Sequence, residues 1–154
     1  MDILLNFGKI FLAILLGGLI GLEREKQDKP AGLRTCMLVT VASTMVVIFS
    51  QVMLKGNPNL DIMRAPAYML SGINFLGAGI IMAKQNKIEG ITTAAILLVL
   101  VPLGLLVGIG TLESVILAIG CAIVTFLILE LKRLEIKFKW NKKPITKKKN
   151  EKNN

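Results

Sequence analysis

Long apolar runs alternate with short polar segments along most of this chain. Each run has about 20 residues, the length that crosses about 30 Å of hydrocarbon as an α-helix. The segments between them, such as REKQDKPAG and KGNPNLDIMR, carry the charge, proline, asparagine and glycine typical of turns. The pattern predicts an all-α polytopic membrane bundle of about five transmembrane helices, at Ile3–Leu22, Leu33–Leu54, Pro66–Ala83, Ile91–Gly110 and Leu112–Leu131.

Composition supports a bilayer as the solvent. Of the 154 residues, 53% are hydrophobic and 19% are charged, whereas a soluble domain has about 45–50% and about 25%. The mean hydropathy is +0.64. A water-soluble fold of this length would have too few polar residues to cover so many apolar ones. We therefore expect one transmembrane domain over residues 1–131, followed by a basic, disordered cytoplasmic tail over residues 132–154.

The basic residues give the chain a direction across the membrane. With five spans, one side collects the tail and the loop residues Arg24, Lys26, Lys29, Arg34, Lys84 and Lys87, while the other holds Lys9, Lys55 and Arg64. The positive-inside rule then places the N-terminus outside and the C-terminus in the cytoplasm. The first run lacks a basic segment before it and an A-x-A-like cleavage site, so we expect no removable signal peptide.

Several chemistries are excluded. The chain has no histidine, which removes the usual general base and metal ligand. Cys36 and Cys121 have no CxxC spacing and are interpreted as membrane-buried thiols. No cofactor fingerprint is present, so we expect a protein that is not an enzyme and has no cofactor. The basic residues border the membrane, which favours anionic lipid headgroups over nucleic acid as their partner.

Small residues recur at helical spacing in three runs. They are Ala13, Gly17 and Gly21, then Gly104 with Gly108, and Ala118 with Ala122. In lipid, such stripes let helix backbones approach closely and pack by dispersion. They predict a compact bundle, although glycine is also frequent in membrane helices for no specific reason.

Charged residues cluster where the first run ends, in the sequence GLERE. Glu23, Arg24 and Glu25 lie at the inner mouth of the first helix, and Arg34 opens the second helix from the same side. Pairing these side chains with one another would offset most of the free-energy cost of holding charges near hydrocarbon. The leading interpretation is therefore a structural clamp, in which ion pairs join the ends of the first and second helices. The alternative is a divalent-cation site, with Glu23 and Glu25 as weak Mg²⁺ candidates.

Three further features are candidates for function. Asn74 falls near mid-span, and its amide should face the bundle, either to fix packing or as a polar step on a solute path. Thr92 and Thr93 begin the fourth helix, where capping is expected and anion binding is the alternative. Pro102 interrupts the fourth run and could kink it or follow the curvature of the bundle.

The blocks LLGGLIGLERE, PAGLRT, SGINFLGAGII and GITTAA, in this order, resemble the membrane domain of the MgtC/SapB family over about residues 10–110. The resemblance implies a bacterial inner-membrane protein of about five helices, linked to magnesium homeostasis, to growth under magnesium limitation and, in pathogens, to survival inside host cells. Such proteins were first named magnesium transporters. The best-known member looks less like a transporter than a regulator of other membrane proteins, including the proton-driven ATP synthase.

The resemblance also carries over to individual positions. These are Glu23, Arg24, Glu25, Pro30, Gly32, Arg34, Thr35, Ser71, Gly72, Phe75, Gly77, Ala78, Gly79, Gly90, Thr92, Thr93 and Ala94. Asn74, Leu98 and Pro102 depart from the family pattern, where glycine, tryptophan and an alanine-rich stretch are common. Longer relatives add a soluble C-terminal domain, in place of which this sequence has its basic tail.

Two functions from different classes follow. The first is a non-enzymatic module that modulates a partner membrane protein or self-associates. The second is a transporter for Mg²⁺ or another cation, motivated by Asn74, the interrupted fourth run and the Glu23 and Glu25 pair. A cation passage normally needs several polar or acidic ligands near the midplane. The predicted spans carry no carboxylate there, which favours the first.

Overall fold

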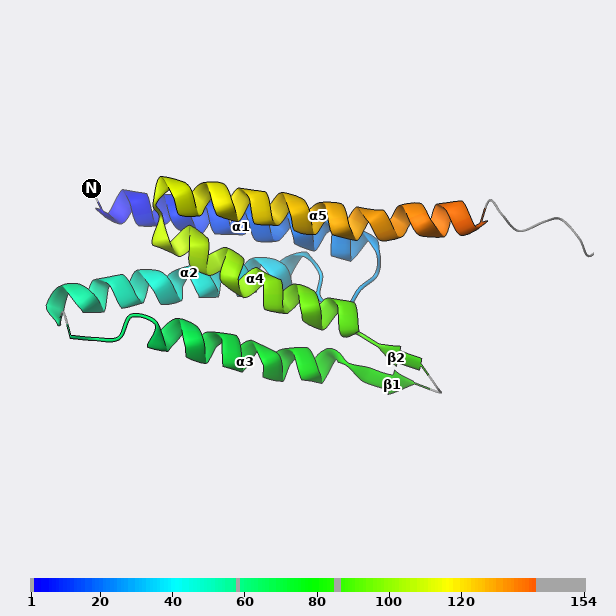
Figure 1. Ribbon diagram of the computed structural model, residues 1–154, viewed down its shortest axis with the longest axis horizontal. Coiled ribbons are helices and arrows are strands. Elements are labelled where there is room, and N and C mark those ends of the chain that lie inside the picture. The colour runs from blue at the N-terminus through cyan, green and yellow to red at the C-terminus, as the bar shows by residue number, and fades with distance from the viewer. Residues whose placement is uncertain (1, 58, 85–86, 141–154) are drawn as a thin grey trace, which may run out of the picture.

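The computed structural model describes residues 2–57, 59–84 and 87–140, with side chains placed for residues 3–57, 59–81 and 88–131. This part of the chain forms a helical bundle with one short β-hairpin (Figure 1). The elements, in order, are α1 (Asp2–Lys26), α2 (Leu33–Gly56), α3 (Arg64–Ile80), β1 (Met82–Lys84), β2 (Lys87–Glu89), α4 (Ile91–Ile109) and α5 (Leu112–Trp140).

Four of the described helices, α1, α2, α4 and α5, are long and apolar enough to cross a membrane. The remaining helix, α3, has 17 residues, which corresponds to about 26 Å. It is therefore slightly shorter than the hydrocarbon thickness of about 30 Å. The prediction of an all-α membrane bundle is confirmed in fold class, and α3 is the shortest of its helices.

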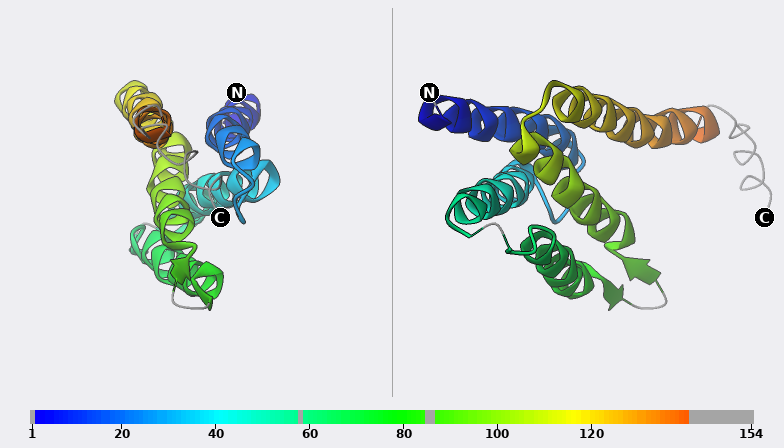
Figure 2. Two further views of the ribbon diagram at one scale, coloured as in Figure 1. Left: turned by 90° about the vertical axis from the view of Figure 1, so that its right-hand side faces the viewer. Right: turned by 60° about the vertical axis from the view of Figure 1, so that its left-hand side comes forward.

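Helix α4 contacts all four other helices, and α2 packs closely on both α1 and α4. Helix α3 lies beside α4 at one edge of the bundle, and α5 lies beside α4 and α1 at the opposite edge (Figures 1 and 2). Each helix runs back along its predecessor, so the start of α1 and the end of α5 lie at opposite ends of the molecule (Figure 1).

Two pairs of glycines, each four residues apart, hold α2 between its neighbours. A Cβ added at Gly17 or Gly21 of α1 would lie 2.9 Å or 2.7 Å from backbone atoms of α2. At Gly108 of α4 it would lie 2.7 Å from the Cβ of Val47, and at Gly104 it would collide with an α2 carbonyl oxygen. The predicted close packing along these stripes is confirmed.

The distribution of large apolar side chains fits lipid rather than water as the solvent. The interior is filled mainly by α4, whose Leu100, Val101 and Leu103 are fully buried. On α1 and α5 the outward positions are also large and apolar, such as Phe11 at 62% exposure and Leu117 at 61%. Contiguous exposed apolar faces of this kind are expected where hydrocarbon surrounds the protein.

The end of the third apolar run differs from the prediction. Helix α3 ends at Ile80, and the next residues form the antiparallel hairpin of β1 and β2, with Met82 opposite Glu89 and Lys84 opposite Lys87. The helix predicted to reach Ala83 was therefore too long, and the hairpin was not foreseen. Hydropathy stays high through Ile81 and Met82, so it could not mark the change from helix to strand.

The last helix also differs from the prediction. Helix α5 continues past Leu131 to Trp140, whereas the disordered tail was predicted to begin at residue 132. Neither glycine nor proline occurs between Leu131 and Trp140, so no residue in this stretch favours ending the helix. Residues 141–154, the remainder of the predicted tail, lie outside the described residues.

Two features inside the predicted spans have structural explanations. The Lys9 ammonium donates hydrogen bonds to the carbonyl oxygens of Gly108 and Ile109, at 3.0 and 3.4 Å. It thus caps the C-terminus of α4, where a cation is stabilised by the helix dipole. Pro102 lies on the exposed side of α4, which remains one continuous helix from Ile91 to Ile109.

Candidate functional site

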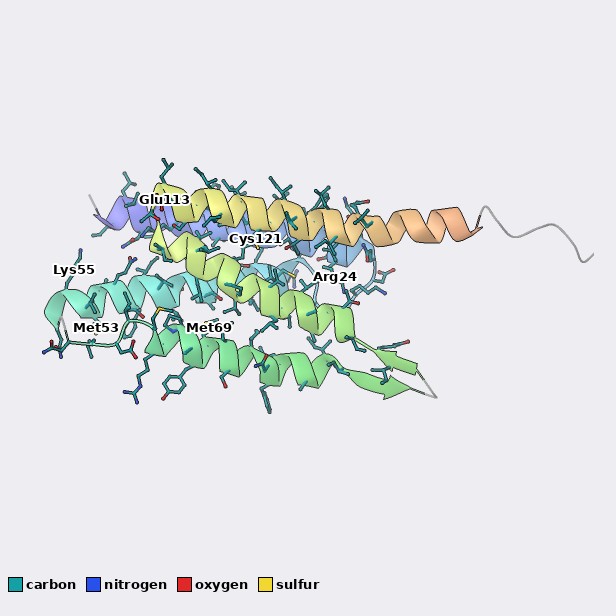
Figure 3. The ribbon with its side chains drawn as sticks, viewed as in Figure 1. Arg24, Met53, Lys55, Met69, Glu113 and Cys121 are labelled. Atoms are coloured by element: carbon teal, nitrogen blue, oxygen red, sulfur yellow. The ribbon has the colours of Figure 1, made fainter. Side chains whose placement is uncertain are left out.

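Three helix ends meet on the side of the bundle that carries the GLERE segment: the end of α1 and the starts of α2 and α4. Figure 3 shows Arg24 on this side and Lys55 and Glu113 toward the opposite end. Glu23 and Arg24 are buried, at 3% and 2% exposure. Charged groups are rarely buried to this extent without partners, so this end of the bundle is the candidate functional site.

Arg24 connects α1 to α4. Its Nη2 donates a hydrogen bond of 2.7 Å to the hydroxyl oxygen of Thr93, which is 1% exposed. Its Nε has no hydrogen-bond partner in the described part of the structure. The Glu23 carboxylate is near enough to interact electrostatically with the guanidinium. A buried cation with an unsatisfied donor is costly, so Arg24 is the residue of this site that most requires an explanation.

The two carboxylates flanking Arg24 have separate roles. Glu23 accepts a hydrogen bond of 2.9 Å from the side-chain amide of Gln27, one turn along α1. Glu25 accepts a hydrogen bond of 2.9 Å from the backbone N–H of Leu33. Because Leu33 is the first residue of α2 and the N-cap Gly32 has no side chain, Glu25 satisfies a donor that would otherwise be free.

The predicted clamp is therefore wrong in its pairing. Among the described residues, Glu23 and Glu25 accept their hydrogen bonds from Gln27 and Leu33, and Arg24 donates to Thr93. Arg34 is exposed on the first turn of α2. Arg24 and Glu25 face different neighbouring helices, because Glu25 must face α2 to reach its N-terminus while Arg24 faces α4.

The predicted magnesium candidates Glu23 and Glu25 do not lie in a larger ligand cluster. Within the described residues, no group of three or more acidic, cysteine or histidine side chains is placed to hold a metal ion. Cys36, predicted to be a membrane-buried thiol, is fully buried, and Cys121 is half-buried.

The prediction that Thr92 and Thr93 cap α4 is also wrong. The N-cap position is Gly90, which has φ of +92° and makes no side-chain hydrogen bond. Glycine is required there, because a Cβ would collide with the Ile80 carbonyl oxygen as well as strain the backbone. Thr93 instead points inward to Arg24, and Thr92 is exposed.

Asn74 does not face the bundle as predicted. It is exposed on α3, whereas its neighbour Ile73 is 5% exposed and, with Gly77, forms the packed face. Successive helix residues are about 100° apart, so packing through Ile73 turns Asn74 away from α4.

A row of buried polar side chains on α2 was missed by the sequence reasoning. The hydroxyls of Thr40 and Ser43 donate to carbonyl oxygens of their own helix at 2.8 Å, and that of Thr44 donates across to the Gly104 carbonyl oxygen at 2.8 Å. Their three- to four-residue spacing was the available signal. These hydroxyls are small enough to fit against the glycines of α1 and α4.

Fold and site together define a multi-pass helical membrane protein with a buried arginine at one end of its bundle. The family model described as "MgtC family" matches residues 10–136. The chain belongs to this family, as the motif blocks indicated. No solved structure matches the chain.

Three relatives illustrate the comparison. SapB of Bacillus subtilis (strain 168) is 43% identical over 115 residues, 71% of this chain and 48% of the relative. YhiD of Escherichia coli (strain K12), whose name proposes a magnesium transporter, is 35% identical over 128 residues, 80% of this chain and 58% of the relative. MgtC of Brucella abortus (strain 2308) is 43% identical over 101 residues, 66% of this chain and 41% of the relative. The chain spans about half the length of these relatives.

Proposed function

We propose that this chain is a non-enzymatic module of the bacterial inner membrane that modulates partner membrane proteins when magnesium is scarce. The magnesium link is drawn from the family and from the name of YhiD. The modulating role is drawn from the packing of the bundle. Since the chain spans about half of its relatives, the proposal concerns the membrane domain that they share.

The observation that carries this proposal is the close packing of α1 and α4 onto α2. Glycine contacts from both sides press α1 and α4 onto α2, and the α2 hydroxyls donate to backbone carbonyls. An interior packed in this way is suited to presenting fixed lateral surfaces to other membrane proteins. A cation path would instead need several polar ligands lining a common space.

Growth and cross-linking together test the modulating role. Cells lacking the gene should grow more slowly than wild-type cells at low magnesium and equally well at high magnesium. A photoreactive residue at exposed Leu38 or Ile128 should cross-link a membrane protein in low magnesium, and the same residue at fully buried Leu100 should not. Deleting the captured protein should remove the growth difference. Equal growth at every magnesium concentration, or adducts with lipid alone, would overturn the proposal.

Cation transport is the second candidate, and the buried carboxylate of Glu23 favours it. Mg²⁺ uptake into liposomes containing the purified protein decides between the two. Under our proposal, uptake equals that of empty liposomes. Uptake that is lost in Glu23→Gln, and retained in Glu113→Gln at the exposed start of α5, would establish the transporter instead.

A further inference from the structure

The first turn of α4 carries backbone donors that no side chain of its own caps. The first hydrogen bond of the helix runs from the Ala94 N–H to the Gly90 carbonyl oxygen, at 2.9 Å. The N–H groups of Ile91, Thr92 and Thr93 precede it and therefore have no acceptor within the helix. The N-cap Gly90 makes no side-chain hydrogen bond, and the first turn has no acidic residue. The positive end of the α4 dipole is thus left without a negative group of its own.

A buried guanidinium lies against the same turn. Arg24, in the last turn of α1, is 2% exposed, and its Nη2 donates a hydrogen bond of 2.7 Å to the Thr93 hydroxyl oxygen. Its Nε is buried and has no hydrogen-bond partner in the described part of the structure. A helix N-terminus stabilises an anion and disfavours a cation. A positive side chain with an unmade hydrogen bond at this position indicates that the missing group is an anion.

The neighbouring carboxylate does not supply this anion. Glu23 interacts electrostatically with the Arg24 guanidinium, but its Oε1 accepts a hydrogen bond from Gln27. Its single negative charge balances the charge of the guanidinium and leaves the helix end uncompensated. The corresponding place on α2 is filled, since Glu25 accepts from the Leu33 N–H. Of the two helices that begin at this end, α2 therefore has a carboxylate at its first amide, and no described carboxylate bonds to the first turn of α4.

The first turn of α4 is accessible from outside the bundle. Ile91 is 56% exposed and Thr92 is exposed, whereas Thr93, on the inner side, is 1% exposed. The turn follows the hairpin, at the end of the bundle that carries Arg24 (Figures 1 and 3). The apolar span of α4 begins at Ile91, which places this turn where the hydrocarbon meets the headgroups. An anion can arrive there from the water or as part of a lipid headgroup.

We propose that a phosphate oxyanion binds at the first turn of α4, held by the N–H groups of Ile91 and Thr92 and by the Arg24 guanidinium. A change of the Arg24 rotamer brings its unmade donor to the anion. Phosphate oxygens accept several hydrogen bonds at once, which suits a planar guanidinium beside a helix N-terminus. Inorganic phosphate and the phosphodiester of an anionic phospholipid present the same chemistry here. The site is independent of the proposed function, since it requires neither a partner protein nor transport.

Thermal unfolding of the purified full chain in a maltoside detergent, followed by circular dichroism, measures this binding. Sodium phosphate should raise the melting temperature above that in sodium chloride of equal ionic strength. Phosphatidylglycerol in the micelle should raise it above diacylglycerol, which lacks the phosphate group. A response to inorganic phosphate identifies the free anion as a ligand, and a response to phosphatidylglycerol alone identifies the headgroup. No response to either would overturn the proposal.

Arg24→Gln tests the role of the guanidinium. It should weaken the affinity, obtained from the dependence of the melting temperature on ligand concentration, by about tenfold or more, because a charged hydrogen-bond donor is lost. Arg34→Gln, at an exposed arginine on the same end of the bundle, is the matched control and should bind as wild type does. An equal loss in the two variants would show diffuse attraction to a basic surface and would contradict the assigned site.

Thr92→Asp tests the site without changing the buried arginine. Thr92 is exposed in the first turn of α4, so a carboxylate there supplies the missing negative charge. It should abolish the ligand response and raise the melting temperature of the ligand-free protein. Thr92→Asn has nearly the same shape without the charge and should retain the response. This pair decides the question even if Arg24→Gln does not fold, and a Thr92→Asp variant that responds as strongly as wild type would refute the site.

Discussion

Replacing Gly104 with alanine should loosen the contact between α4 and α2. The added Cβ would lie 2.7 Å from the Cβ of Ser43 and would collide with the Thr40 carbonyl oxygen. To restore an ordinary contact, Ser43 must retreat by about 0.7 Å. Because the second obstacle is a backbone atom, no change of rotamer relieves it, and the helices must separate.

The magnitude follows from three contributions. Overpacking a close-packed interior costs about 1–3 kcal/mol. Separation also lengthens the hydrogen bond from Thr44 to the Gly104 carbonyl oxygen, now 2.8 Å, which adds about 0.6 kcal/mol in a membrane. The higher helix propensity of alanine, compared with glycine, offsets this loss of stability by up to about 1 kcal/mol. We therefore expect Gly104→Ala to lower the free energy of unfolding by about 1–3 kcal/mol.

Cys36 provides the assay. It is fully buried on α2, one turn before Thr40, and with Cys121→Ser it is the only thiol. Its maleimide labelling, measured in mixed micelles of rising SDS content, reports the opening of this interface. The Gly104→Ala midpoint should fall well below that of the parent.

The matched control is Gly120→Ala on α5, where an added Cβ meets nothing within 4 Å. The same chemical change at that position should leave the midpoint unchanged or slightly raised. Equal midpoints for the parent and Gly104→Ala, or an equal decrease in Gly120→Ala, would refute the packing argument.

Three further substitutions probe the loop end of the bundle, by the same labelling assay. Thr93→Val leaves the buried Arg24 guanidinium without its acceptor and should lower the free energy of unfolding by about 1–3 kcal/mol. Thr92→Val, at the exposed neighbouring position, should leave it unchanged, and equal effects of the two substitutions would contradict the inward role of Thr93. Glu25→Ala removes the acceptor for the first amide of α2 and should cost about 1 kcal/mol, whereas Glu25→Gln retains an oxygen and should lose less. Gly90→Ala should destabilise by more than about 1 kcal/mol, because φ is +92° and the Ile80 carbonyl blocks the Cβ; a stability equal to wild type would show that the turn can rearrange.

The fold class was predictable because it depends on local quantities. Runs of apolar residues near bilayer length identify membrane helices from composition alone, and glycines four residues apart mark faces of close approach. Gly17, Gly21, Gly104 and Gly108 were all identified in this way, and all lie at helix contacts. The hairpin after Ile80 was not predicted, since its apolar residues continue the hydropathy of the helix before it.

The candidate site was predictable only in its residues. The sequence identified Glu23, Arg24, Glu25 and Thr93, but it paired the charges with one another. Arg24 bonds instead to a hydroxyl 69 positions away. Which group a side chain contacts depends on the rotation of its helix about the helix axis. Neighbouring residues in a helix point about 100° apart, so one residue can face a neighbouring helix while the next faces lipid. Asn74 was placed on the wrong side for the same reason.

The sequence by itself determined that lipid solvates this chain, that its helices pack through small residues, and that it belongs with the MgtC proteins. All three conclusions depend only on residue types and on their spacing along the sequence. Only the tertiary structure decided that Arg24 reaches across to α4, that Glu25 serves α2, and that Asn74 faces outward. Those outcomes depend on how five helices are rotated against one another, and that rotation is set by packing contacts between residues far apart in the sequence.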